Sequence, residues 1–377
     1  MLCRLCRREI SETPGLFLPG MPAVSQHLPE TPEPGGVDLK IAECPACGLV
    51  QLVNAPVPYY REVIRAAAYS PEMGEYRRRQ FAKWVADYRL AGGRILEPGC
   101  GRGEYLKLLR DSADVEVFGT EWGEAAAAEA CAGGLRVERS FFERGDERLA
   151  GAPFDGFFTF NYLEHLPDPG AFLRGIAGNL KAGAPGIVEV PNFDLMLEKA
   201  IFSEFTIDHL CCFTAATLRK MLEINGFEVL NCRVAWHDYV ISAEVRRRRG
   251  IDFSGFSTAA EKLLGEIAAF CGETPAEELA VWGAGHQAFA LLASPVLKAR
   301  FGCIVDSAAF KQGRFSPASA LPIVSPAVLD AGNITGVVVM GGSYSDEIVG
   351  RIREKYGRRH RLAVVREDHL EIMDQTN

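Results

Sequence analysis

Residues 93–111 read GRILEPGCGRGEYLKLLRD and place a short apolar strand, a glycine-rich turn and an amphipathic helix in direct succession. Leu106 and Leu109 have the spacing of one helix face, and the glycines allow backbone N–H groups to approach a ligand closely. A second apolar segment, VEVFGTE, ends at Glu121, 22 residues after Gly99. A carboxylate at about this distance commonly binds a ribose diol. The stretch therefore predicts an α/β fold that binds a nucleoside-containing ligand.

Length and charge limit the kind of protein that this chain can be. At 377 residues it exceeds one ordinary core, which predicts two or three domains. A net charge of -8 and a pI near 5.5 give no general attraction to nucleic acid or to an anionic membrane. The sequence shows no apolar signal region and no stretch of about 18 apolar residues, so a cytoplasmic location with reduced cysteines is expected.

Four N-terminal cysteines form two C-x2-C pairs, CRLC at Cys3 and Cys6 and CPAC at Cys44 and Cys47, with 37 residues between the pairs. Two such pairs supply the four thiolates of a tetrahedral zinc site. The Pro- and Gly-rich segment between them has too little apolar periodicity for a core, so a metal is expected to stabilise it. Four protein ligands leave no position for water, which predicts structural zinc. Four unrelated thiols are the alternative.

The first glycine loop has the pattern E-x-G-x-G-x-G, which differs from the dinucleotide pattern G-x-G-x-x-G. Its defining residues are Glu97, Gly99, Gly101 and Gly103. The loop resembles motif I of class I S-adenosylmethionine-dependent methyltransferases. The resemblance implies that these four residues face the methionine part of S-adenosylmethionine and that Glu121 binds its ribose. The later segments FNYLEHLPDP and GAPGIVEVPN are similar to the fourth-strand and fifth-strand motifs of that class.

The same resemblance assigns Trp122, Phe142 and Asn161 to the cofactor pocket. Many members of the class have an acidic residue for the adenine amine after the third strand, where this chain has Phe141 and Phe142. We therefore expect aromatic stacking on adenine, with Glu143 as a second candidate for the amine. His165, in NYLEHLPDP, is interpreted either as a proton-transfer group near the methyl or as a structural histidine at a strand-to-helix turn. The structural interpretation is favoured.

The order of motifs covers nearly the whole chain: C-x2-C, C-x2-CGLVQL, E-x-G-x-G-x-G, LEHLPDP, VPN, DHL and a second glycine loop. This order resembles the three-domain sugar C-methyltransferases of deoxysugar pathways, such as those for tylosin and novobiocin sugars. The resemblance implies a zinc module, a methyltransferase domain and a C-terminal Rossmann-like domain that helps to bind a nucleotide-diphosphate sugar. It also implies a keto-sugar that is deprotonated beside its carbonyl and methylated on carbon, with oxygen and nitrogen acceptors as alternatives.

The segment SEFTIDHLCCF aligns with the Y-H-E-H-L segment of that family. The last histidine there is the family's base, so the resemblance implies that His209 is the general base and Asp208 the neighbouring acidic residue. Ile207 stands in place of the family's first histidine, and Thr206 in place of its tyrosine. A further catalytic tyrosine of the family, upstream of the glycine loop, is matched most closely by Tyr69.

His209 can also be considered on chemistry alone. The sulfonium already activates the methyl group, so the protein has only to align an acceptor and remove a proton, which suits imidazole. The alternative is a buried histidine with a satisfied hydrogen bond. In an extended chain Asp208 faces away from its neighbour, which predicts a substrate contact or a helix N-terminal cap rather than a triad partner.

The C-terminal third contains a second strand, glycine turn and helix, LAVWGAGHQAFALLAS. Its G-x-G-x-x-A pattern is followed by a strand that ends at Asp306, 23 residues after Gly283, and by GGSYS at a later helix start. The predicted substrate-nucleotide residues are Gly283, Gly285, His286, Ser343 and Tyr344. The alternatives are an NAD-dependent oxidoreductase, a nucleotide-sensing module, or glycines that serve only tight packing.

We predict five segments along the chain. They are a four-cysteine zinc module at 1–55, a helical linker at 56–90, a class I methyltransferase domain at 91–245, a linker helix at 246–274 and a Rossmann-like domain at 275–377. A small-molecule substrate is expected in a cleft between the two larger domains, because ligands bind at the carboxyl ends of parallel strands. No nucleic acid or membrane partner is expected.

Overall fold

The computed structural model describes residues 1–11, 13–24, 35–62 and 69–373. Parts of the predicted zinc module and of the predicted helical linker lie outside these ranges. The chain forms two compact units, Met1–Gly250 and Ile251–Asn377. Every helix in the described ranges is too short or too polar to cross a bilayer. The five-part division of the chain stays a prediction.

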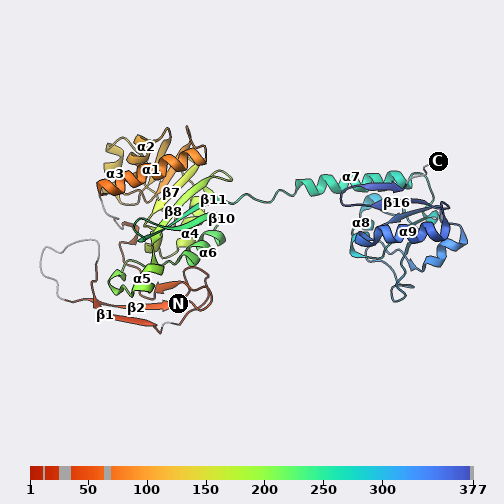
Figure 1. Cartoon of the computed structure of the whole chain (residues 1–377), viewed down its shortest axis with the longest axis horizontal. Helices are drawn as coiled ribbons and strands as arrows, with labels where there is room; N and C mark the ends of the chain where they lie inside the picture. Colours follow the sequence, from red (N-terminus) through yellow and green to blue (C-terminus); the bar gives the residue numbers. More distant parts are fainter. Residues whose placement is uncertain (12, 25–34, 63–68, 374–377) are drawn as a thin grey trace. The chain divides into compact units, whose positions relative to one another are not determined.

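A seven-stranded sheet forms the centre of the first unit (Figure 1). Its strands, in spatial order, are β10 (Phe227–Ala235), β11 (Val240–Arg247), β8 (Pro185–Pro191), β7 (Gly156–Phe160), β4 (Arg94–Pro98), β5 (Glu116–Thr120) and β6 (Arg136–Glu138). The five strands from β8 to β6 are parallel, whereas β11 runs antiparallel to both of its neighbours. The glycine loop follows β4, the middle one of the five parallel strands, so it opens at their carboxyl edge.

Helices cover both faces of this sheet, because side chains on successive strand positions point to opposite sides. Ile95 and Phe158 share a core with α1, α2 and α3, whereas Leu96 and Phe157 share a core with α4 and α6. The helices of this unit are α1 (Pro71–Asp87), α2 (Glu104–Ser112), α3 (Glu124–Ala132), α4 (Pro169–Gly178), α5 (Phe193–Lys199) and α6 (Ala215–Ile224). Burial on both faces explains why the strands β4, β7 and β8 are mostly apolar.

A second, four-stranded sheet connects the N-terminal module to the segment that carries His209. Its strands, in spatial order, are β1 (Leu16–Met21), β2 (Val37–Glu43), β3 (Val50–Leu52) and β9 (Cys211–Cys212). β9 pairs antiparallel with β3, and the Leu52 N–H donates to the Leu210 carbonyl at 3.1 Å. Buried Arg4 donates to the Leu52 carbonyl at 2.6 Å. The module is therefore packed directly on the chain that flanks His209.

The second unit contains a six-stranded sheet that is parallel except for its last strand. In spatial order its strands are β14 (Ile323–Val324), β13 (Cys303–Val305), β12 (Leu279–Trp282), β15 (Gly336–Val339), β16 (Arg361–Val365) and β17 (Leu370–Met373). The helices of this unit are α7 (Ser254–Cys271), α8 (His286–Leu292) and α9 (Ser345–Tyr356). The predicted α/β class with a C-terminal Rossmann-like domain is confirmed.

Candidate functional site

The first glycine loop turns sharply between β4 and α2. Gly99, Gly101 and Gly103 have φ angles of 70°, 58° and 78°, a region that residues with a side chain rarely adopt. A Cβ on Gly103 would also collide with the Leu135 side chain. Glu97 is completely buried at the end of β4. The loop backbone therefore has a shape that strongly favours glycine at these positions.

The carboxylate of Glu121 lies against this loop at the carboxyl end of β5. It accepts a hydrogen bond from the Gly101 N–H at 2.9 Å and another from the Gly123 N–H at 2.7 Å. The structure therefore brings the predicted ribose acceptor and the predicted glycine loop into direct contact. Asn161 lies at the end of β7, which pairs with β4 on the side away from β5, and it has a left-handed φ of 48°.

Two aromatic residues meet close to Glu121, in the segments that follow β5 and β6. The rings of Trp122 and Phe141 meet edge to face, with centroids 6.4 Å apart. Phe142, which the sequence suggested, is instead buried in the core with its ring centroid 6.0 Å from that of Phe172. Adjacent residues in this segment point in opposite directions, so Phe141 rather than Phe142 faces Trp122.

Arg61 joins this aromatic pair, a contact that the sequence gave no reason to expect. Its guanidinium lies 5.0 Å from the ring centroid of Trp122 and pairs with Glu143 at 2.5 Å. Glu143, the second candidate for the adenine amine, is therefore already engaged by a cation. Arg61 and Glu143 are 82 residues apart in the chain, and no motif connects them.

Two histidines from distant segments meet in the same unit. His165 ends a short 3-10 helix (Leu163–His165), and His209 follows a turn that its N–H closes by donating to the Thr206 carbonyl at 3.3 Å. Their rings meet edge to face with centroids 4.7 Å apart. Burial lowers the pKa of His165 to about 3 and also lowers the pKa of His209, so both rings are neutral at pH 7.

Asp208 does not face away from this pair. Its carboxylate accepts a hydrogen bond from the Thr206 hydroxyl at 2.6 Å, and it is buried with one oxygen 3.8 Å from Nδ1 of His165. The chain forms a turn here rather than the expected extended segment, and no helix begins at Asp208, so the helix-cap interpretation was wrong. The Thr206 hydroxyl therefore fixes the orientation of this carboxylate.

Tyr69 belongs to a different cluster from the histidines. Its ring stacks on Tyr105 of α2, with centroids 5.7 Å apart and an interplanar angle of 13°. Tyr105 in turn meets Phe160 at the end of β7, edge to face at 5.5 Å. Tyr69 therefore lies beside the first turn of the helix that follows the glycine loop.

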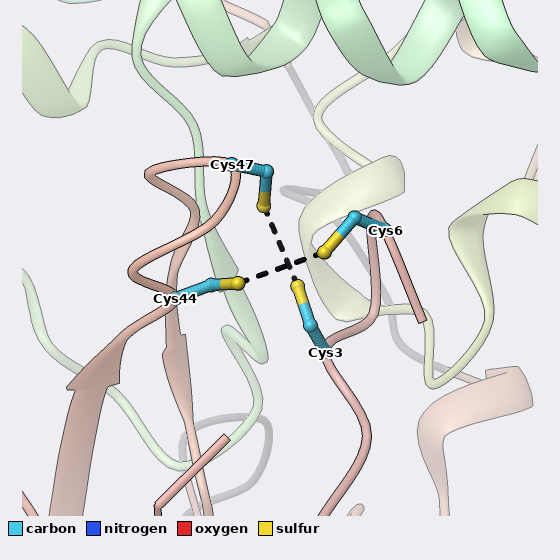
Figure 2. A group of neighbouring side chains, drawn as sticks. All are labelled: Cys3, Cys6, Cys44 and Cys47. Carbon is cyan, nitrogen blue, oxygen red and sulfur yellow. Dashed lines mark hydrogen bonds between the residues drawn. The ribbon is translucent and has the colours of Figure 1, made fainter. Parts of the chain in front are cut away.

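The four N-terminal cysteines converge on one point (Figure 2). The sulfur atoms of Cys3 and Cys47 lie 3.6 Å apart, as do those of Cys6 and Cys44, and all four lie within 4.8 Å of one another. A tetrahedral zinc ion with Zn–S bonds of about 2.3 Å needs sulfur atoms about 3.8 Å apart. Burial raises the pKa of Cys6 and Cys47, whereas backbone N–H groups and neighbouring thiols outweigh burial at Cys44 and lower its pKa to about 7. The donor set and its spacing therefore fit zinc.

The second unit gathers its predicted substrate residues around one pocket of about 600 Å³. The pocket is lined by Gly283, Gly285, His286, Ser343 and Tyr344, together with Asp306, Lys311 and Arg351. Asp306 does not present a free carboxylate to a ribose. It accepts hydrogen bonds from the Ala284 and Ala308 N–H groups at 2.9 and 2.8 Å and pairs with Lys311 at 2.9 Å. The pairing of Asp306 with the Lys311 cation, rather than its two backbone hydrogen bonds, disfavours the NAD alternative.

Comparison with known protein families agrees with this architecture. Residues 73–231 match the family model of a methyltransferase domain, and residues 244–365 match the model of a C-methyltransferase C-terminal domain. Together with the glycine loop and the strand order, these matches define a class I S-adenosylmethionine-dependent methyltransferase with a C-terminal domain of the C-methyltransferase type.

Individual proteins that resemble this chain carry methyltransferase names. A Mycolicibacterium smegmatis protein named "Probable S-adenosylmethionine-dependent methyltransferase" is 29% identical over 175 residues, which are 46% of this chain and 67% of that protein. An S-adenosylmethionine-dependent methyltransferase structure from Mesorhizobium loti has 18% identity and a TM-score of 0.35, and covers 44% of this chain and 98% of its own. One from Clostridium acetobutylicum has 12% identity and a TM-score of 0.38, with coverages of 50% and 96%.

Proposed function

We propose that this enzyme transfers a methyl group to a carbon atom of a nucleotide-linked keto-sugar, with His209 as the general base. One observation carries the choice of carbon over oxygen or nitrogen: residues 244–365 match a C-methyltransferase C-terminal domain. A methyl acceptor on carbon must first lose a proton, and carbon beside a ketone is acidic enough for an imidazole to remove it. The proposal therefore needs a base and a means of holding a ketone near it.

The base in this proposal is supported by the position of His209. It is the partly exposed member of the histidine pair, whereas His165 is buried. The turn closed by Thr206 and the strand β9 fix the backbone on either side of it. A side chain on a backbone that is fixed in this way can be aligned with a bound substrate without further ordering of the chain, which favours proton transfer. In this proposal His165 and Asp208 position the His209 side chain.

S-adenosylmethionine, when bound, supplies a methyl group that a positively charged sulfur has already activated. The residues that would hold it are the glycine loop, Glu97, Glu121 and Trp122. The loop offers backbone N–H groups at the carboxyl edge of the sheet, and Glu121 offers carboxylate oxygens for a diol. Phe141 replaces Phe142 as the proposed adenine neighbour, because its ring meets that of Trp122.

For the second unit we propose that the pocket around Gly283 and Ser343 binds the nucleotide part of the substrate. Both cations of the pocket are paired, Lys311 with Asp306 and Arg351 with Glu347, so a diphosphate would rely on backbone N–H groups rather than on free positive charge. The substrate in this proposal is a small molecule, and neither nucleic acid nor a membrane takes part. The cysteine cluster is proposed to hold a structural zinc ion.

The test is methyl transfer from labelled S-adenosylmethionine to a panel of nucleotide-linked keto-sugars, with the corresponding reduced sugars as controls. We expect a product that carries one more methyl group, which NMR places on a carbon next to the carbonyl. The reduced sugars should not react, because they contain no acidified carbon–hydrogen bond. A methyl ether or a methylamine as the product would overturn the proposal.

A further inference from the structure

The histidine pair is part of a larger cluster with the composition of a metal site. Glu164, His165 and His209 each offer one ligand atom, and these atoms lie within 4.8 Å of one another. Two histidines and one carboxylate, with a remaining position open to water or a ligand, form a well-known ligand set for zinc and for other divalent transition ions. The cluster is made by different residues from the cysteine cluster.

The hydrogen bond of His165 orients it as a ligand. Its Nδ1 lies 3.0 Å from the carbonyl oxygen of Asp208, and because a carbonyl only accepts, Nδ1 must carry the proton. In the neutral ring Nε2 then has a free lone pair, and it faces Glu164 with 3.9 Å between Nε2 and the nearer carboxylate oxygen. Histidines that bind metals commonly donate their other ring N–H to a backbone carbonyl in this way.

Glu164 provides the negative charge of the cluster. It is adjacent to His165 on the 3-10 helix, and only 1% of its surface is exposed. A carboxylate removed from water is stabilised strongly by a divalent cation, since an ion compensates the charge that solvent no longer screens. The two imidazoles beside it are uncharged ligands that such an ion prefers.

The cluster needs a modest contraction to bind an ion. Tetrahedral coordination with metal–ligand bonds of about 2.0–2.1 Å places ligand atoms about 3.3 Å apart. Since the ligand atoms lie within 4.8 Å of one another, the widest pair must approach by at most about 1.5 Å. Glu164 and His165 are buried and fixed, but His209 is partly exposed. Rotation of the His209 side chain is therefore the movement that closes the site.

We propose that Glu164, His165 and His209 form a second metal site, selective for a divalent transition ion such as Zn²⁺ or Co²⁺. When His209 binds the ion, its ring nitrogen donates to the metal the lone pair that it would need to accept a proton as a base. Metal-bound and catalytically competent forms therefore exclude each other, and the ion is an inhibitor of methyl transfer. Metal binding itself does not rest on the proposed function; only the inhibition does.

Cobalt absorption tests the site directly in the full chain. Protein whose cysteine cluster is filled with zinc is titrated with Co²⁺, and we expect one further equivalent to bind with visible d–d bands typical of nitrogen and oxygen ligands. A sulfur-to-cobalt charge-transfer band in the near ultraviolet would reveal exchange into the cysteine cluster instead. Absence of a cobalt site outside the cysteine cluster overturns the proposal.

Two variants and a matched control assign the ligands. Glu164→Gln keeps the shape of the side chain but removes its charge, and His209→Ala removes a partly exposed ligand; each should weaken Co²⁺ binding at least about tenfold. Glu204→Gln is the control, because Glu204 is a nearby carboxylate outside the cluster that accepts from the Tyr239 hydroxyl at 2.5 Å. Circular dichroism checks that each variant is folded. Unchanged Co²⁺ affinity in folded His209→Ala overturns the assignment.

Activity gives the second readout. Zn²⁺ or Co²⁺ at concentrations that fill the site should stop methyl transfer and spare S-adenosylmethionine binding, and a chelator that leaves the cysteine cluster loaded should restore turnover. Turnover that rises with the added ion contradicts the proposed exclusion. A protein that binds cobalt at this cluster but methylates no keto-sugar refutes the proposed function and leaves the metal site confirmed.

Discussion

Glu121 illustrates how one side chain can serve both the fold and the site. Its two hydrogen bonds to Gly101 and Gly123 hold the glycine loop next to β5, and the same carboxylate is the proposed ribose acceptor. Sequence spacing predicted its position because both loop and carboxylate lie at the ends of adjacent parallel strands. The hydrogen bonds to the loop could not be predicted, since they depend on side-chain rotamers.

Glu121→Ala should weaken S-adenosylmethionine binding by about 1–3 kcal/mol, because it removes a charged hydrogen-bond acceptor and loosens the loop. Isothermal titration calorimetry measures the change. Glu124→Ala is the control: Glu124 lies three residues further on and pairs with Arg139 at the surface, with 80% of its side chain exposed. Equal affinities for Glu121→Ala and the control would refute the role of Glu121.

His209→Ala should lower turnover by about 100-fold or more, because general bases typically contribute about 10²–10⁴. His209→Asn should not restore activity, since an amide cannot accept the proton. S-adenosylmethionine affinity should be unchanged in both variants. His237→Ala serves as the control, as His237 is an exposed histidine paired with Glu72 at 3.0 Å. Near-normal turnover in His209→Ala would return it to a structural role and direct attention to Tyr69.

The side chains around His209 show where sequence reasoning stops. From the sequence, the segment around Asp208 and His209 was expected to be extended, with Asp208 facing away from His209. The structure has a turn there, closed by the Thr206 carbonyl, and this turn directs Asp208 towards His165. Glu164 was overlooked because a single acidic residue beside a histidine has no characteristic pattern. Contacts between residues more than 40 positions apart, such as His165 with Asp208, depend on the packed fold.

At the level of elements, β9 is a strand that could not be predicted from the sequence. It has only two residues, Cys211–Cys212, and no sequence signal distinguishes a strand of this length from a loop. The strands that precede the two glycine loops, β4 and β12, were predictable, because each is an apolar run followed by a glycine turn. The strand, loop and helix units were therefore available from the sequence, whereas the pairing of β9 with β3 was not.

Asp306 links the loop after β12 to the strand β13, and its titration should affect the second unit. Burial acts to raise its pKa, but hydrogen bonds from Lys311 and the Ala308 and Ala284 N–H groups outweigh burial and lower it. The ionised carboxylate therefore stabilises the fold above the unfolded-state pKa of about 3.9, and this contribution is lost as the pH falls through the lower folded-state pKa.

Asp306→Asn should accordingly lower the melting temperature of the second unit at neutral pH, and the difference from the unmodified protein should shrink below about pH 4. Calorimetry at several pH values measures both. Asp330→Asn is the control, because Asp330 pairs with Lys355 at 2.9 Å on the surface, where ion pairs contribute little. A melting difference that is independent of pH would show that the charge of Asp306 is not responsible.

At the scale of the first unit as a whole, the cysteine cluster is connected to the segment that carries His209. β3 pairs with β9 directly after His209, and Lys220 of α6 donates to the Cys47 carbonyl at 2.9 Å. Loss of the metal should therefore disturb the position of His209 through the packing of the module, although the cluster lies outside the site. The sequence predicted the four ligands but not this connection.

Metal analysis of the purified protein should find one zinc ion per chain in the cysteine cluster. Cys44→Ser should lose it, unfold the N-terminal module locally and lower turnover, while the S-adenosylmethionine affinity changes little. Hydrogen exchange of β2 and β3 amides follows the local unfolding. Cys131→Ser is the control, because Cys131 is exposed and lies outside the cluster. A metal-free protein that is folded and fully active would disprove the structural role of zinc.

Proton exchange tests whether His209 removes a proton from the carbon next to a ketone. The enzyme is incubated in deuterated water with a nucleotide-linked keto-sugar and S-adenosylhomocysteine, which cannot donate a methyl group, and NMR follows the substrate's α-hydrogen. The proposed mechanism predicts that the unmodified enzyme exchanges this hydrogen for deuterium and that His209→Ala does not. Methyl transfer without any exchange in the unmodified enzyme, or equal exchange in the variant, would show that His209 is not the base.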